Sequence, residues 1–218
     1  MKIVCISDTH NKHEELILPE GDCIIHAGDF TEAGSKKETK NFLEWFSSLE
    51  FDHKILIAGN HDFYLEKKFY KLDQIIPNNI HYLQDSGVRI DNINFWGSPY
   101  IPDDNNWAFS KNRGKQISEH WDKIPVDTNI LITHSPPFGI MDELDNKLMV
   151  GCKNLKGRLK KLQLSHHIFG HVHNEYGKTK ISKTLFVNSS SIDESYRVIN
   201  NPISIEFRQE SIKSDKGH

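Results

Sequence analysis

Five short apolar runs along this chain end in the same way, with a turn that carries aspartate, asparagine or histidine. Each run is rich in isoleucine, valine or leucine, which predicts a buried β-strand. The turns supply only oxygen and imidazole groups: Asp8-Thr9-His10, Gly28-Asp29, Gly59-Asn60-His61-Asp62, His134 and Gly170-His171-Val172-His173. One such turn would mean little. Five in series indicate that several strand ends converge on one metal-binding site.

The spacing within these turns suits shared ligation. Residues two apart in an extended chain face the same side, so Asp8 and His10 can converge on one ion, and His171 and His173 on two neighbouring ions. Imidazole with carboxylate suits Mn²⁺, Fe or Zn²⁺ better than Ca²⁺, and a set without thiolates argues against structural zinc. Two ions about 3.5–4 Å apart can clamp a phosphoryl group during in-line attack. The pattern predicts a hydrolytic enzyme.

The charge of such a site would dominate its surroundings. About +4 from two ions against −2 from Asp8 and Asp29 leaves roughly +2, which attracts phosphate esters. The chain as a whole has a net charge of −3, so no long nucleic acid is expected as a partner. No apolar stretch approaches the roughly 18 residues that cross a bilayer, and no membrane partner is expected.

Length and cysteine content favour one intracellular domain. The 218 residues suffice for one well-buried domain, predicted over 1–208 with a polar tail at 209–218. The three cysteines lack CxxC spacing, and Cys5 and Cys23 lie in apolar runs, which indicates buried free thiols. A cytoplasmic location is expected.

Strands alternating with helices predict a layered α/β fold. The strand-like runs are 2–6, 23–27, 54–58, 93–96, 129–133, 166–169, 184–188 and 203–207. A capping box of Ser35 and Glu38 begins one helix, and apolar spacing predicts others over 63–72 and 155–162. No strong helical pattern separates 184–188 from 203–207, which favours antiparallel pairing there.

The ordered motifs resemble those of the calcineurin-like metallophosphoesterases, and the match spans nearly the whole chain. The resemblance implies a four-layer α-β-β-α sandwich, with two mixed β-sheets flanked by helices. It implies a first metal held by Asp8, His10, Asp29 and His173. It implies a second metal held by Asp29, Asn60, His134 and His171, with Asp29 bridging. His61 would be the catalytic histidine.

Secondary motifs resemble the small metallophosphoesterase-domain-containing proteins, some of which hydrolyse phosphodiesters, including cyclic nucleotides. The matching segments are Asp8-Thr9-His10-Asn11, Gly97-Ser98-Pro99-Tyr100, Trp107-Ala108-Phe109 and His134-Ser135-Pro136-Pro137. Two neighbouring families fit less well. Purple acid phosphatases have tyrosine where this chain has Glu32, and serine/threonine protein phosphatases have arginine where it has Ala58.

These observations predict a dinuclear phosphodiesterase acting on a small, nucleotide-like substrate, with a cyclic nucleotide as one candidate. A metal-bridging hydroxide would attack phosphorus, and His61 would assist the leaving oxygen. The cofactors would be two divalent ions, Mn²⁺ first, with Fe, Zn²⁺ or Mg²⁺ as alternatives. A phosphomonoesterase and a non-catalytic binding or scaffold protein remain the competing functions. The oligomeric state is left open.

Substrate contacts are expected from Asn60, His61, Tyr100 and Trp107. The last two lie in the long loop 98–114, where an aromatic side chain can stack on a base or anchor the loop to the core. Asp62 is predicted to cap a helix, and Asn188 to begin a turn. The histidines expected at the surface are His13, His53, His81, His120 and His218, while His26 and His167 are expected in the core.

Overall fold

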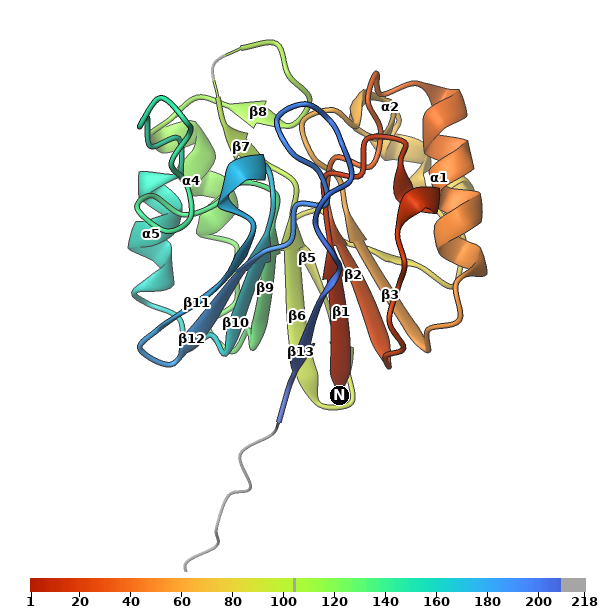
Figure 1. Ribbon diagram of the computed structural model, residues 1–218. Helices are drawn as coiled ribbons and strands as arrows, with labels where there is room; N and C mark the ends of the chain where they lie inside the picture. The colour runs from red at the N-terminus through yellow and green to blue at the C-terminus, as the bar shows by residue number, and fades with distance from the viewer. Residues whose placement is uncertain (104, 209–218) are drawn as a thin grey trace, which may run out of the picture.

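A computed structural model describes residues 1–103 and 105–208 of the chain. Its framework is two mixed β-sheets packed face to face, with helices on both outer faces (Figure 1). The expected four-layer arrangement is therefore confirmed. The tail predicted at 209–218 lies outside the described residues.

The first sheet holds the three N-terminal strands in parallel. Its order is β13 (Ile203–Glu206), β1 (Lys2–Ile6), β2 (Cys23–Ala27), β3 (His53–Ile57) and β4 (His81–Tyr82). Only β13 runs antiparallel to its neighbour, and its Ile205 pairs with Ile3 of β1. The carboxyl ends of β1, β2 and β3 therefore lie along one edge of the sheet.

The second sheet repeats this arrangement with four parallel strands at its centre. Its order is β11 (Gly177–Ile181), β12 (Thr184–Asn188), β10 (His166–Phe169), β9 (Ile130–Thr133), β6 (Ile93–Ser98) and β5 (Ser86–Ile90). The outer strands β11 and β5 are antiparallel. A small sheet of β7 (Ile101–Pro102) and β8 (Ser110–Lys111) lies within the loop that follows β6.

Apolar side chains of the two sheets interlock between them. Ile25 and Ile57 from the first sheet and Phe95, Ile132 and Ile168 from the second belong to one buried cluster. The backbones approach closely at Gly97 of β6, where a Cβ would lie 2.7 Å from Ile57 Cγ2. Alternate residues of the same strands face outward and are covered by helices.

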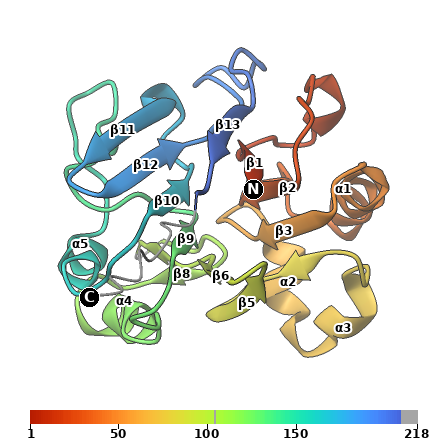
Figure 2. The same ribbon diagram turned by 90° about the horizontal axis from the view of Figure 1, so that it is seen from below.

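The helices divide between the outer faces, as the perpendicular view shows (Figure 2). Over the first sheet lie η1 (His13–Glu15), α1 (Lys36–Ser48), α2 (Phe63–Lys67), η2 (Phe69–Lys71) and α3 (Leu72–Ile75). Over the second lie α4 (Lys115–Trp121) and α5 (Lys153–Leu159), which pack on Leu131. None of the helices in the described ranges is both long and apolar enough to cross a membrane.

Of the two predicted helices that lie over the first sheet, one begins as expected and the other is broken. The capping box is confirmed, because the Ser35 hydroxyl accepts a hydrogen bond from Glu38 N at 3.2 Å and Glu38 accepts one from Ser35 N at 2.7 Å. The helix expected over 63–72 is instead broken into α2, η2 and α3. The break follows Lys68, whose amide hydrogen bonds to Tyr64 and Leu65 close the first short helix.

The antiparallel pairing expected between 184–188 and 203–207 is wrong. Both segments are strands with an antiparallel neighbour, but they belong to different sheets: β12 pairs with β11, and β13 pairs with β1. The intervening chain crosses from one sheet to the other, and a bridge between Ser190 and Ser7 marks the crossing.

Candidate metal centre

All the metal-type turns emerge at one edge, where the carboxyl ends of the parallel strands of both sheets meet. β1 leads to Asp8 and His10, β2 to Asp29, and β3 to Asn60 and His61. On the second sheet, β9 leads to His134, and β10 to His171 and His173. The carboxyl ends of β1, β2, β3, β9 and β10 lie at the same end of the molecule (Figure 1). The predicted ligands follow these strand ends directly.

One ligand group joins the ends of β1 and β10. Ligand atoms of Asp8, His10 and His173 all lie within 4.8 Å of one another. Asp8 is held from both sheets, because Ser7 Oγ donates to its carboxylate at 2.5 Å and the His171 amide donates to it at 3.0 Å. His173 Nε2 lies 3.7 Å from Asp8 Oδ1.

A second group joins the ends of β2, β9 and β10. Asp29, His134 and His171 offer ligand atoms within 4.8 Å of one another. His134 Nε2 lies 3.1 Å from Asp29 Oδ2 and 3.0 Å from Asn60 Oδ1, and its Nδ1 donates to Ala27 O at 2.9 Å. This last bond fixes the ring so that Nε2 faces the other candidate ligands.

A third group overlaps the other two and includes His61. His10, Asp29 and His61 also lie within 4.8 Å through their ligand atoms. The His61 ring is 4.6 Å from the His10 ring, and the His61 amide donates to Asp29 Oδ1 at 2.8 Å. Since Nδ1 of His61 donates to the Glu32 carbonyl at 2.7 Å, Nε2 is the nitrogen free to exchange a proton.

Burial and the charges of neighbouring groups shift the pKa values of several candidate ligands. Burial opposes ionisation of Asp29, but the charge and hydrogen bond of His134 outweigh it and lower the pKa of that carboxyl below its usual range. Burial opposes protonation of His134, yet Asp29 raises its pKa to about 9. Burial lowers the pKa of His10 and of His171 to about 4, which keeps both rings in the neutral form that binds metal.

The side chains present fit a divalent metal. Both ring nitrogens of His10 are buried without a hydrogen-bond partner among the described residues, and so is Nδ1 of His173. Buried polar atoms of this kind call for an explanation, and an ion is one. The donor set is imidazole, carboxylate and amide oxygen, which suits Mn²⁺, Fe or Zn²⁺.

The turns depend on unusual backbone geometry. Asp8, Asp29 and His171 have φ values of 50°, 56° and 72°, a left-handed conformation that non-glycine residues adopt rarely. Gly28 has a φ of 97°, and a Cβ there would lie 2.6 Å from His134 Nδ1. A Cβ at Gly170 would collide with Asp8 Oδ2 and Ser7 Oγ. The sheets meet at the site through these glycines.

Asp62 has a different part from the helix cap predicted for it. It occupies the N-cap position of α2, but its side chain makes no capping hydrogen bond. Its buried carboxylate instead accepts hydrogen bonds from the amides of Gly59 at 2.7 Å, Asp29 at 3.0 Å and Thr31 at 3.0 Å. It therefore joins the turns after β2 and β3. Burial and the charge of Asp29 raise the pKa of Asp62 to about 7.

Asn188, predicted to begin a turn, is instead the last residue of β12, and its side chain supports the turn after β10. Its carbonyl oxygen accepts from Ser190 N at 3.1 Å, and its amide donates to Val172 O at 2.8 Å. Val172 lies between His171 and His173, so Asn188 fixes the peptide that separates them. Its place at the carboxyl end of β12, beside β10, is the signal that could have revealed this contact.

The two aromatics predicted as substrate contacts have different positions. The Trp107 ring packs 4.7 Å from the His61 ring and is 41% exposed, so it borders the cluster. Tyr100 stacks on His120 at 3.6 Å and lies 5.7 Å from Phe109. Its described ring contacts do not include a ligand, so the structure does not bring Tyr100 to the cluster. It anchors the loop 98–114 instead, of which residue 104 lies outside the described residues.

The remaining histidines are partly as expected. His26 and His167 are completely buried, which confirms their place in the core. His13 was expected at the surface, but it is buried against Phe42 and Trp45 at ring distances of 5.3 and 4.8 Å. His120, also expected at the surface, is largely buried, and its Nδ1 lies 2.6 Å from Asp85 Oδ2. Cys5 and Cys23 are buried free thiols, as predicted.

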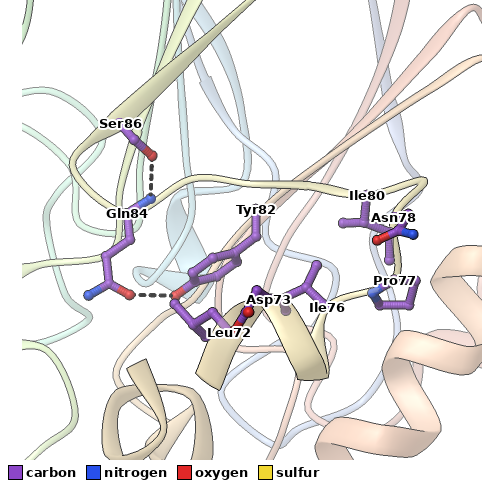
Figure 3. A pocket seen from close by; sticks show the side chains of 9 residues that line it. All are labelled: Leu72, Asp73, Ile76, Pro77, Asn78, Ile80, Tyr82, Gln84 and Ser86. Carbon is purple, nitrogen blue, oxygen red and sulfur yellow. Dashed lines mark hydrogen bonds between the residues drawn. The ribbon is translucent and has the colours of Figure 1, made fainter. Parts of the chain in front are cut away.

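Two surface hollows differ in their relation to the cluster. One of about 470 Å³ lies beside α3 and is lined by Leu72, Ile80, Tyr82 and Gln84 among others; it includes no predicted ligand (Figure 3). Another of about 370 Å³ is lined in part by His173, Tyr176 and the segment 193–195. Only the second opens beside the candidate metal centre.

Comparison with known sequences matches this chain to phosphoesterases. A family model described as calcineurin-like phosphoesterase matches residues 1–175. The chain is 37% identical to metallophosphoesterase domain-containing protein 1 from Homo sapiens, over 94% of this chain and 71% of that protein. It is 27% identical to a probable glycerophosphodiester phosphodiesterase from Arcobacter nitrofigilis, over 85% of this chain and 74% of that protein.

Comparison with solved structures shows a shared fold. The crystal structure of phosphopantetheinyl hydrolase from Mycobacterium tuberculosis aligns with a TM-score of 0.60, covering 87% of this chain and 88% of that one. The sequence identity is 14%, so the likeness concerns the fold alone.

Proposed function

The chain belongs to the calcineurin-like phosphoesterases, and from this premise we propose that it is a dinuclear phosphodiesterase acting on a small, nucleotide-like ester. The family gives the coarser activity, a metal-dependent phosphoester hydrolase. One observation carries the finer proposal: three overlapping ligand groups converge, and the middle one contains a histidine, His61, whose Nδ1 is already bonded to a backbone carbonyl.

The proposed ligands divide into two sets that share Asp29. The first set is Asp8, His10, Asp29 and His173, and the second is Asp29, Asn60, His134 and His171. Divalent ions bound there, Mn²⁺ in our proposal, would neutralise phosphoryl oxygens and activate a water molecule for in-line attack. Asn60 contributes an uncharged oxygen, so only Asp8 and Asp29 offset the positive charge of the ions.

His61 has the geometry of a proton donor. The Glu32 carbonyl holds Nδ1, and the packed Trp107 ring restrains the imidazole from one side. Nε2 is then the atom that would protonate the departing oxygen or donate to a phosphoryl oxygen. Trp107 beside it would contact the leaving group.

Preference for a diester has two supports. The relative from Arcobacter nitrofigilis is named a probable glycerophosphodiester phosphodiesterase. The hollow beside His173 provides space for a second substituent on phosphorus. A cyclic nucleotide, which is an internal diester, is included among the proposed substrates. A phosphomonoesterase is the second candidate, because the same ligands can clamp either ester.

A substrate panel tests the proposal. The chain would be stripped of metal, reloaded with Mn²⁺ and assayed on bis(p-nitrophenyl) phosphate, 2′,3′- and 3′,5′-cyclic nucleotides, and p-nitrophenyl phosphate. We expect turnover of at least one diester. Turnover of the monoester alone would favour the second candidate, and no turnover with two ions bound would favour a non-catalytic binding protein.

The His61→Ala variant tests the assigned chemistry. Losing a positioned proton donor typically lowers kcat by about 10²–10⁴-fold, whereas the metal content should stay at the wild-type value. Metal content by mass spectrometry and kcat on the best diester separate these effects. If kcat were unchanged in metal-loaded protein, His61 would not be the proton donor; if metal were lost, it would be a ligand.

A further inference from the structure

Tyr196 covers the side of the candidate metal centre that is formed by His10 and His173. Its ring lies 4.9 Å from the His10 ring and 5.8 Å from the His173 ring, edge to face in both cases. The residue belongs to the segment between β12 and β13, and it is 36% exposed. The Tyr196 ring is thus partly exposed and packs against two proposed ligands. It lies where it could contact a bound substrate.

The loop that carries Tyr196 is built to hold this position. Tyr196 has a φ of 59°, which is unfavourable for a bulky side chain and persists only where the surroundings enforce it. Asp193 provides that support: its carboxylate accepts hydrogen bonds from the amides of Ser195 and Arg197, both at 2.9 Å, and from Arg197 Nε at 2.8 Å. The Tyr196 amide donates to Asp193 O at 2.9 Å.

Four rings form a series across the site. Trp107 lies 4.7 Å from His61, His61 lies 4.6 Å from His10, and His10 lies 4.9 Å from Tyr196. The two half-exposed aromatics are therefore at opposite ends of the series, with the proposed proton donor next to Trp107. A leaving group has to depart beside that donor, on the Trp107 side.

The other side offers space for a second substituent. The hollow of about 370 Å³ beside His173 is lined by residues 193–195, which directly precede Tyr196. Its lining includes the carboxylates of Asp145 and Glu194, and these disfavour a negatively charged substituent. An uncharged ring fits both this lining and the face of a tyrosine.

We propose that Tyr196 is a specificity-determining residue that contacts the substituent retained on phosphorus, and that this substituent is an uncharged ring. The inference rests on the proposed function, in which His61 serves the leaving group. In that hydrolysis the oxygen of water bonds to phosphorus and the bond to the leaving oxygen breaks. The leaving oxygen takes up a proton, so an alcohol departs and a phosphomonoester that keeps the second substituent remains.

The test varies the retained substituent while keeping the leaving group constant. Mn²⁺-loaded protein would be assayed on p-nitrophenyl phosphate, methyl p-nitrophenyl phosphate and phenyl p-nitrophenyl phosphate. The ring would be removed by Tyr196→Asn, because asparagine tolerates a left-handed backbone, and retained by Tyr196→Phe. We expect Tyr196→Asn to lower the ratio of kcat/KM for the phenyl ester to that for the monoester by about three- to tenfold, the range of an aromatic contact.

Two further variants show whether the change in substrate preference is specific to Tyr196. Trp107→Ala should lower kcat/KM for all three esters alike, since they share the leaving group. Tyr70→Ala removes an exposed tyrosine whose ring contacts Phe69, Lys68 and Lys71, and it should change nothing. A ratio that is unchanged in Tyr196→Asn, or an equal loss on all three esters, would overturn the role of Tyr196.

Product binding gives a readout independent of turnover. Calorimetry on metal-loaded protein should show weaker binding of phenyl phosphate to Tyr196→Asn than to wild type, with binding of inorganic phosphate retained. Equal weakening of both ligands would mean that the loop supports the metal centre rather than selecting the substrate. If wild-type protein hydrolysed none of the esters, the proposed function itself would fail, whatever the Tyr196 variants bind.

Discussion

The two β-sheets contribute different chemistry to the same edge. The first sheet supplies both candidate carboxylates, Asp8 and Asp29, together with Asn60 and His61, whereas the second supplies histidines only. Hydrogen bonds cross between them, from the His171 amide to Asp8 and from His134 Nδ1 to Ala27 O. The carboxylates of the candidate site thus come from one sheet, and most of its imidazoles come from the other. The site exists only where the sheets are packed together.

Substituting one candidate ligand from each sheet should lower metal binding and kcat by unequal amounts. Asp29 lies in two of the three ligand groups and carries the charge, so Asp29→Asn should weaken both ions and lower kcat by about a thousandfold. His171→Gln should weaken only the second ion, with a loss of about a hundredfold. Bound metal per chain, measured by mass spectrometry after dialysis, checks the difference.

The exposed residues Asp91 and His81 provide matched controls. Asp91→Asn and His81→Gln make the same chemical changes away from the cluster and should keep wild-type metal content and kcat. Equal metal loss in Asp29→Asn and His171→Gln would show that the sheets do not divide the ligands as described.

The contact between the sheets can be tested at Gly97. In Gly97→Ala the new methyl group would meet Leu83 and Ile57 across the packed core, so the free energy of unfolding should fall by about 1–3 kcal/mol. Gly157→Ala is the matched control, because a Cβ there meets nothing within 4 Å. Gly157 lies in α5, where alanine should raise the free energy of unfolding by about 0.5–1 kcal/mol. Urea unfolding of metal-free protein measures the change for each variant. If both substitutions raised the free energy of unfolding, or both lowered it, the described packing at Gly97 would be contradicted.

The smallest expected effect concerns the pH dependence of stability, to which the two sheets contribute in the same way. Each contains a buried histidine bonded to a threonine hydroxyl: His26 to Thr9 at 3.0 Å and His167 to Thr133 at 2.8 Å. Burial lowers the pKa of each from 6.5 to about 3. Below pH 6.5 each histidine is protonated in the unfolded chain but stays neutral in the folded chain. Both histidines therefore lower the free energy of unfolding as the pH falls from 6.5 towards 3.

His26→Gln and His167→Gln should each remove part of this acid sensitivity. Between pH 6 and pH 4, each variant should take up about one proton fewer on unfolding than wild type does. Urea unfolding at a series of pH values gives that slope. Parallel curves for wild type and variant would mean that the substituted histidine is not buried in its neutral form.

Sequence reasoning located the central strands because each is a continuous apolar run, buried on both faces. It missed β5 and β11, which are edge strands with alternating or exposed residues, such as Gly177–Ile181. It also missed the short helix α4. Their signal lies in pairing and packing with distant segments, which a local pattern does not contain.

The same distinction applies to the site. The candidate ligands lie in short turns directly after strands, so local motifs were enough to propose them. Asp62, Asn188 and Tyr196 contact residues that follow other strands, so their contacts depend on how those strands pack and not on the local motif alone. Tyr100 shows the converse: a motif residue in a promising loop proved to contact His120 rather than the cluster.

The pairing of β1 with β13 has a consequence for biosynthesis. Met1 N donates to Phe207 O across 206 positions, so the strand that leads to Asp8 gains its outer neighbour only when that distant segment is present. A ribosome releases β1 first and β13 nearly 200 residues later. Until then one edge of β1 is unpaired, and the nascent chain is open to wrong strand pairing while the residues between β1 and β13 are made. The strand that leads to Asp8 therefore completes its pairing only after β13 has been synthesised.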